Sequence, residues 1–256
     1  MKKQHGALPA HMLFSNMPPL EAAKILCSLL ASKKTSKAGK LLKLALYDIS
    51  RAHFYGESQR AVYVTLPEGD QAENMCALLH KTMYGTQDAS HVWQEHYSKK
   101  FIERGFVQGQ AWTSVFQHPE RDVTLLVHGD DFLVLGDEDG QKYLRDTLSE
   151  KYEYRCDGCI GPEDNQHMTL LNRIVTYHKD GSVSFEADPR HAEMIIRQLG
   201  LEGSKGISTP GEKKKLSDVV GTSVLPPMNA ERTTLFRSLV MRAQFLGQDR
   251  AASLNR

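Results

Sequence analysis

Hydrophobic positions recur at helical spacing in five stretches of the chain. The run LEAAKILCSLLAS at 20–32 combines good helix formers with spaced leucines, and ASHVWQEHYSKKFIERGF at 89–106 carries Trp93, Tyr97 and Phe101 at steps of four ahead of Gly105. Such spacing predicts helices with one buried face. The same pattern predicts helices at 141–152, at 188–201, where Asp188 and Pro189 form the start, and at 231–256.

Short apolar runs bounded by turn residues predict strands between these helices. They comprise KLALYDIS at 43–50, AVYVTLPEG at 61–69, and two or three strands in TSVFQHPERDVTLLVHGDDFLVLGDEDG at 113–140. HMTLLNRIVTYHKDGSVSFEA at 167–187 predicts a hairpin that turns at KDG. The mixture indicates an α+β fold, and residues 203–229, rich in Gly, Pro, Ser and Lys without periodicity, predict a linker.

The composition is that of an ordinary globular protein, with 40% hydrophobic and 25% charged residues in 256. No run of 18 or more apolar residues is present, and the lysine-rich opening MKKQHGALPAH is not followed by an apolar signal region. We therefore expect an intracellular protein without a signal peptide or transmembrane segment.

A net charge of +1 gives no global basic field, so nucleic-acid binding has to come from local patches. One such patch precedes the strand at 43 and contains Lys33, Lys34, Lys37 and Lys40. A solvated loop and a phosphate-binding loop both fit this pattern.

The four cysteines include a single CxxC, CDGC at 156–159. One CxxC is half of a zinc site, and the chain has no second pair or suitably spaced histidines to complete it. A turn with reduced thiols is the favoured interpretation.

Two adjacent aspartates, Asp130 and Asp131, stand where the apolar run LLVHGDDFLV is expected to turn. Like charges side by side need a partner, which solvent, a basic side chain or a divalent cation would supply. Asp48 ends the earlier strand, and the three carboxylates converge if the strands are neighbours in one sheet. Oxygen ligands of this kind suit Mg²⁺.

The order of the motifs resembles the reverse transcriptase of copia-type retrotransposons. DISRAHFYG resembles the first aspartate motif of that family, and VYVTLPEG the strand that follows it. LLHKTMYGTQDASHVW resembles the Tyr-Gly block, and LLVHGDDFLVLG the catalytic hairpin. TPGEKK and FRSLVMRAQFLGQDR resemble the blocks that lead toward a ribonuclease H region.

This resemblance implies a right-hand polymerase fold that transfers deoxynucleotides to a primer 3′ hydroxyl on an RNA or DNA template. Asp48, Asp130 and Asp131 would be catalytic and would hold two Mg²⁺ ions, or Mn²⁺, with Asp48 and Asp130 as the main ligands. The residues implied at the nucleotide are Ile49, Ala52, His53 and Asp88. Residues 1–202 would form the fingers, palm and thumb region, 203–229 a linker, and 230–256 the start of a connection.

Several positions depart from the family pattern. His128 and Gly129 precede the paired aspartates in place of an aromatic and a hydrophobic residue, His53 replaces an aromatic, and Asp88 replaces a glutamine. The basic strands of the fingers are not found before Leu13, so we expect a domain truncated at both ends. Two hypotheses remain: a working RNA-directed DNA polymerase, and a non-catalytic retrotransposon remnant that at most binds nucleic acid.

Overall fold

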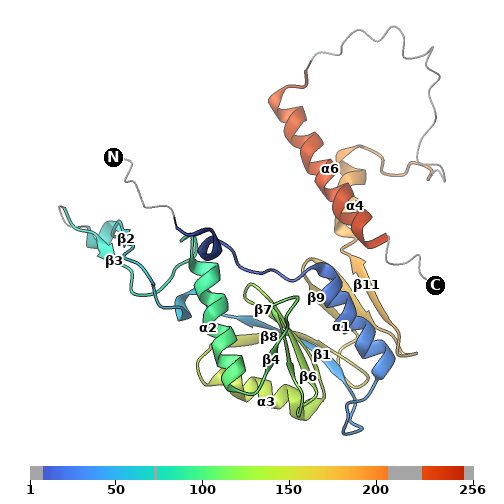
Figure 1. Ribbon diagram of the computed structural model, residues 1–256. Coiled ribbons are helices and arrows are strands. Elements are labelled where there is room, and N and C mark those ends of the chain that lie inside the picture. Colours follow the sequence, from blue (N-terminus) through green and yellow to red (C-terminus); the bar gives the residue numbers. More distant parts are fainter. Residues whose placement is uncertain (1–7, 72–73, 207–226, 251–256) are drawn as a thin grey trace. The chain divides into compact units, whose positions relative to one another are not determined.

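The computed structural model describes residues 8–71, 74–206 and 227–250 (Figure 1). The chain divides into two compact units, Met1–Phe185 and Glu186–Arg256. This division falls before the predicted boundary at residue 202, and most of the predicted linker lies outside the described residues. The predicted assignment of domains stays a prediction.

A six-stranded antiparallel sheet forms the centre of the first unit. Its strand order is β4-β5-β6-β7-β1-β8, so β1 lies between β7 and β8, both of which follow it by a long stretch of chain. The strands are β1 (Lys43–Ile49), β4 (Val107–Gln108), β5 (Val115–His118), β6 (Val123–His128), β7 (Asp131–Gly136) and β8 (Tyr154–Ile160).

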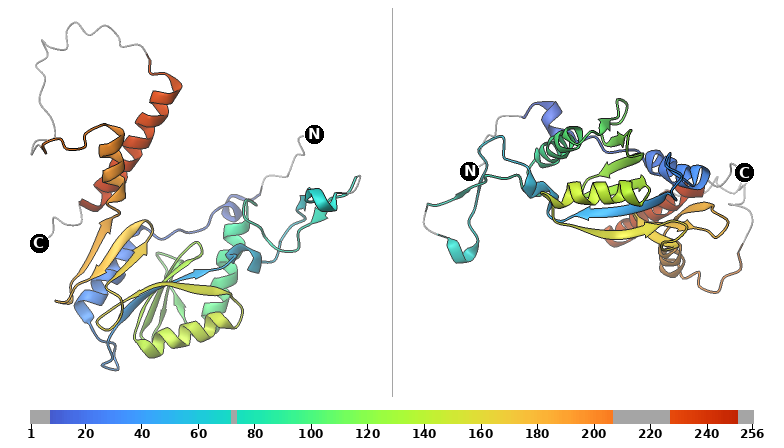
Figure 2. Two further views of the ribbon diagram at one scale, coloured as in Figure 1. Left: turned by 180° about the vertical axis from the view of Figure 1, so that it is seen from behind. Right: turned by 90° about the horizontal axis from the view of Figure 1, so that it is seen from below.

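Hydrophobic side chains cover both faces of this sheet because the residues of each strand alternate between them. Tyr47 and Phe132 point to the face covered by α2 (Ala89–Glu103) and α3 (Glu138–Ser149). Leu46 and Leu133 point to the other face, which α1 (Leu20–Lys33) covers together with β9 (His167–Leu170) and β10 (Arg173–Tyr177) (Figures 1 and 2). Strand β1 is therefore packed against other elements on both faces of the sheet.

The remaining elements are shorter. They are the 3-10 helices η1 (Ala10–Leu13), η2 (Ala52–Tyr55) and η3 (Glu68–Asp70), the paired strands β2 (Tyr63–Val64) and β3 (Ala77–Leu78), and the sheet β11-β10-β9, in which β11 is Val183–Ala187. The last of them, β11, extends past Phe185 into the second unit.

Among its described residues, 186–206 and 227–250, the second unit has the helices α4 (Arg190–Gln198) and α6 (Ala230–Arg250). They meet at His191, whose Nδ1 lies 3.1 Å from the Arg242 guanidinium and whose ring centroid lies 4.7 Å from that of Phe245. Asn229 begins α6, since its side-chain oxygen accepts a hydrogen bond from the Arg232 amide at 2.8 Å.

Helices are present in all five predicted stretches, although α3 lies three residues earlier than expected and α4 is shorter than the predicted 188–201. The last six residues of the helix predicted at 231–256 lie outside the described residues. The strand expected at 61–69 is reduced to Tyr63 and Val64. The turn expected at CDGC is wrong, because these residues lie in β8 and pair with β1. The four cysteines are free thiols. Within the described residues, no helix is both long and apolar enough to cross a lipid bilayer.

Candidate active site

Asp48 and Asp131 lie directly opposite each other on the central strands β1 and β7. Opposed residues in an antiparallel pair project to the same face, with Cβ atoms about 4.5 to 5.5 Å apart. The two aspartates continue the row that Leu46 and Leu133 begin in the core. Asp48 nevertheless keeps 23% of its side chain exposed, so the row ends at solvent.

Asp130 occupies the two-residue turn that joins β6 to β7. Gly129, the first turn residue, has φ +69°, a conformation that glycine adopts without strain and that suits tight hairpins. The Asp130 carbonyl accepts a hydrogen bond of 2.9 Å from the Ile49 amide, and the Trp93 indole donates one of 2.9 Å to the Gly129 carbonyl. These bonds fix the turn beside the end of β1, so the predicted convergence of the strands is present.

A basic side chain lies on the other flank of Asp48. Arg155 of β8 is the register partner of Asp48, and its Nε lies 3.3 Å from Asp48 Oδ2. The same Nε lies 2.7 Å from Oδ1 of Asp157. The register of β8 shifts between Cys156 and Gly158, so Asp157 is the extra residue of a β-bulge.

Arg155 and Asp157 were not predicted from the sequence. The sequence around them, YEYRCDG, has alternating charges, but this pattern indicates a contact with Asp48 only once β8 is known to pair with β1. Of the three partners that could compensate the aspartates, the structure supplies the basic side chain.

The carboxylates still carry negative charge in excess of their partners. Burial raises the pKa of Asp131 to about 6, and the carboxylates of Asp130, Asp48 and Asp157 add to the effect. Burial also raises the pKa of Asp48, against the Arg155 charge, which lowers it. Ionised carboxyls at this point therefore favour the approach of a cation.

The donor set fits a divalent metal ion, because it consists of carboxylate oxygens on two neighbouring strands and their turn. In the part of the chain that the structure describes, no three His, Cys, Asp or Glu side chains are gathered into a ready metal cluster. Shared metal binding by Asp48, Asp130 and Asp131 stays a prediction.

His53 lies beside these carboxylates and stacks on Tyr84, with ring centroids 4.4 Å apart and an interplanar angle of 24°. Burial lowers the pKa of His53, while the Asp130 charge raises it. Burial and the charge of Asp130 raise the pKa of Tyr84. Tyr84 belongs to the Tyr-Gly block, and its place here was not predicted from the sequence; a large ring is thus present despite the histidine at position 53.

The other three residues predicted at the nucleotide have different surroundings. Ile49 and Ala52 are buried in the core, with 1% and 0% of each residue exposed, so the structure does not present them to a ligand. The Asp88 carboxylate is buried and accepts hydrogen bonds from Arg60, 2.9 Å from Nε and 3.1 Å from a terminal nitrogen. Arg60 therefore neutralises the unexpected anion at position 88.

The four predicted nucleic-acid-binding lysines precede β1, whereas Asp48 lies near its end. The strand places about 17 Å between Lys43 and Asp48, at about 3.4 Å per residue. Lys37 donates a hydrogen bond of 3.2 Å to the Pro119 carbonyl, and Lys40 forms an ion pair with Asp139. The structure does not bring these lysines to the carboxylates, and their contact with nucleic acid stays a prediction.

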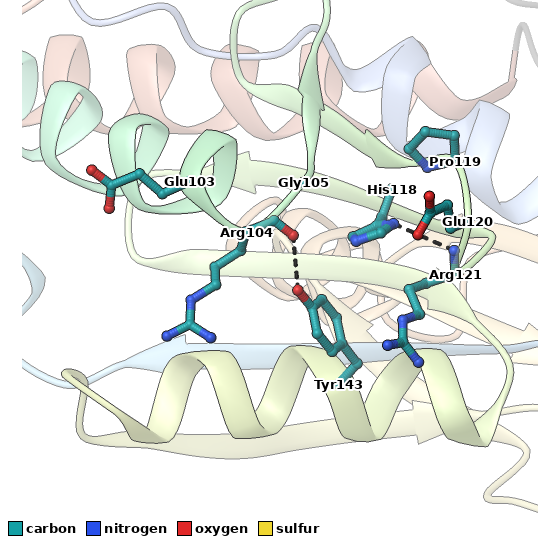
Figure 3. A pocket seen from close by; sticks show the side chains of 8 residues that line it. All are labelled: Glu103, Arg104, Gly105, His118, Pro119, Glu120, Arg121 and Tyr143. Carbon is teal, nitrogen blue, oxygen red and sulfur yellow. Dashed lines mark hydrogen bonds between the residues drawn. The ribbon is translucent and has the colours of Figure 1, made fainter.

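A pocket of about 390 Å³ lies elsewhere, between the end of α2, strand β5 and α3 (Figure 3). In it, Arg121 stacks on the Tyr143 ring at 4.8 Å, and the Tyr143 hydroxyl donates a hydrogen bond of 2.8 Å to the Arg104 carbonyl. None of the residues predicted from the sequence lines this pocket. The aspartates lie at an open edge of the sheet instead.

A family model described as reverse transcriptase (RNA-dependent DNA polymerase) matches residues 14–158. The match spans more than half of the chain and includes Asp48, Asp130, Asp131 and Arg155. The chain belongs to the reverse transcriptase family. Membership in this family, together with the mixed antiparallel architecture, confirms the predicted α+β polymerase fold class.

Two solved structures similar to this reverse transcriptase domain are telomerases. One is apo telomerase from Candida tropicalis truncated from the C-terminal domain, with 14% identity, TM-score 0.40, and coverage of 67% of this chain and 41% of that chain. The other is telomerase from Candida albicans in complex with a TWJ fragment of telomeric RNA, with 12% identity, TM-score 0.36, and coverage of 70% and 36%. The chain thus spans less than half the length of either. No curated protein matches it by sequence.

Proposed function

We propose that this chain is the catalytic region of an RNA-directed DNA polymerase from a copia-type retrotransposon. It would add deoxynucleotides from their triphosphates to a primer 3′ hydroxyl, on an RNA or DNA template. The observation that carries the proposal is the pairing of Asp48 with Asp131 beside the Asp130 turn, inside the region that matches the family. The order of the copia-like motifs supports the narrower assignment.

Asp48 and Asp130 are the main candidates to hold two Mg²⁺ ions, and Asp131 would assist. When bound, such ions lower the pKa of the attacking hydroxyl and neutralise the charge on the triphosphate. The contribution of the protein is position and fixed charge, since β1 and β7 hold Asp48 and Asp131 on rigid elements.

The stacked rings of His53 and Tyr84 would form the side of the site that faces the nucleotide sugar. Tyr84 is 46% exposed, so its ring is available to a ligand, and the Asp130 charge reaches both rings. A ring at this position excludes a ribonucleotide by collision with its 2′ hydroxyl.

Primer extension tests this proposal. With Mg²⁺ and a poly-purine template, Asp130→Asn should lower the rate by about a thousandfold, because it removes several kcal/mol of charge stabilisation. Asp146→Asn is the matched control: Asp146 is exposed on α3, away from the carboxylates of the site, so its removal should leave extension unchanged. An Asp130→Asn variant as active as the unmodified chain contradicts the assignment.

The alternative is a non-catalytic remnant, and the ion pair of Arg155 with Asp48 is the observation that favours it, because it satisfies Asp48 without any metal. A chain that binds template-primer but extends no primer with either Mg²⁺ or Mn²⁺ would establish this alternative.

A further inference from the structure

We propose that Arg155 is a built-in counter-ion of the carboxylate pair, which a divalent cation has to displace from Asp48 before it binds. The inference rests on the proposed function and adds a residue to it.

The sheet itself places Arg155 in this position. Cross-strand register aligns Asp131, Asp48 and Arg155 in one row over β7, β1 and β8, so their side chains share a face. The Arg155 Nε approaches Asp48 Oδ2 at 3.3 Å. The guanidinium thus contacts one of the two carboxylate oxygens that Asp48 can offer to a metal ion.

A metal ion and the guanidinium cannot both occupy this oxygen at low cost. Both are cations, and repulsion between charges a few ångströms apart is substantial in a partly buried site. Asp48 has only 23% of its side chain exposed, which leaves few other directions from which a cation can reach it. Binding of one therefore opposes binding of the other.

The β-bulge gives Arg155 a second partner after it leaves Asp48. Asp157 Oδ1 already lies 2.7 Å from the Arg155 Nε, and a further nitrogen of Arg155 lies 3.3 Å from Asp157 Oδ2. The Arg155 side chain is 69% exposed, so it can move without disturbing the core. Displacement from Asp48 leaves Arg155 paired and does not strand a buried charge.

The test measures Mn²⁺ binding to the full chain by the decrease in the electron paramagnetic resonance signal of free Mn²⁺, at constant ionic strength and without nucleotide. Arg155→Gln should bind Mn²⁺ about three- to tenfold more tightly than the unmodified chain, the range expected for removal of one partly exposed charge near a divalent ion. Arg155→Lys keeps the charge and should bind less tightly than Arg155→Gln.

Arg51→Gln is the matched control. Arg51 is also 69% exposed and pairs with a carboxylate, Glu153, next to the same strands. Equal tightening in Arg51→Gln and Arg155→Gln would show a general charge effect and overturn the inference, as would equal Mn²⁺ binding by Arg155→Gln and the unmodified chain. If neither of these two proteins binds Mn²⁺, the proposed two-metal function fails as well. Tighter Mn²⁺ binding in Arg155→Gln but not in Arg51→Gln supports the proposal that the cation displaces Arg155 from Asp48.

Discussion

At the scale of single residues, the grouping of several carboxylates has its largest effect on the pKa of Asp131. Its pKa is raised from 3.8 to about 6 by burial and by the neighbouring carboxylates. Because the folded-state pKa lies above the unfolded value, Asp131 contributes its full stability to the free energy of unfolding only below about pH 4. That stability is lost as the pH rises through about 6.

Asp131→Asn should therefore stabilise the metal-free protein at pH 8, by about 1 to 2 kcal/mol once solvent screening is discounted. The gain should shrink at pH 5, where Asp131 itself is largely protonated. Urea denaturation in EDTA at both pH values measures the free energy of unfolding. An equal gain at pH 5 and pH 8 would show that the ionised carboxyl is not the cause.

His53 determines a second prediction, on sugar selectivity. An imidazole is smaller than a phenol and can hydrogen-bond a hydroxyl, so the present chain should exclude ribonucleotides less strictly than a His53→Tyr variant. The expected difference is about 1 kcal/mol or more, or at least about fivefold in the ratio of kcat/KM for deoxy- and ribonucleotides.

Phe54→Tyr provides the control for this measurement. Phe54 also packs against Tyr84, but edge to face, with ring centroids 6.0 Å apart. If His53→Tyr and the unmodified chain have the same ratio of kcat/KM for deoxy- and ribonucleotides, His53 does not contact the sugar. Tyr84 is then the remaining candidate for that contact.

The residues of the site could be predicted from the sequence only in part. Asp48, Asp130 and Asp131 were predicted because they end apolar runs and stand in recognisable motifs, and the structure places Asp48 opposite Asp131. Arg155 was not found, because its contact with Asp48 depends on the register between β8 and β1. The role of Asp88 depends likewise on Arg60, 28 residues away.

At the scale of elements, the β6–β7 hairpin depends on one glycine. Gly129 has φ +69°, and a Cβ at this position would meet nothing within 4 Å. Gly129→Val should therefore destabilise the fold through backbone strain alone, by about 1 to 2 kcal/mol. This cost applies although the resemblance to copia-type reverse transcriptases implies a hydrophobic residue at this position.

Thermal or urea unfolding measures this cost, and Gly69→Val is the control. Gly69 also has open space around its Cβ position, but its φ is not positive. A destabilisation of the same size at both glycines would mean that the turn conformation is not responsible.

Element types followed from the hydrophobic pattern where that pattern was long. The helices and the apolar strands β1, β6 and β7 are examples, since burial of one face or both leaves a clear period. Strand β8 was missed because its exposed and half-buried residues carry charges and a bulge. The hairpin at 167–187 contains an additional turn at Leu171 and Asn172, whose φ angles of +49° and +59° the sequence did not reveal.

At the scale of the whole molecule, the distribution of lysines bears on nucleic-acid binding. Lys37 and Lys40 already bind groups of the protein, Pro119 and Asp139. If the basic loop contacts phosphates, Lys33 and Lys34 should contribute more. Changing this pair to Ala should weaken binding and lower the salt slope by about one unit for each phosphate that is no longer neutralised.

The Lys37 and Lys40 double Ala variant is the internal comparison, and fluorescence anisotropy with a template-primer duplex at several salt concentrations is the measurement. If both double variants keep the affinity for the duplex and its salt slope, the lysines of this loop contact solvent and not phosphates.

The position of β1 has a consequence for the synthesis of the protein on the ribosome. Its partner strands begin more than 80 residues further along the chain, at Asp131 and Tyr154. At about 5 to 20 residues per second, β1 waits on the order of 5 to 15 seconds with both edges unpaired. An apolar strand in this state is prone to join another chain, and Lys43 and Asp48 at its two ends place charges where they oppose such pairing. The aspartate proposed for catalysis is thus also expected to oppose pairing of the nascent strand with another chain.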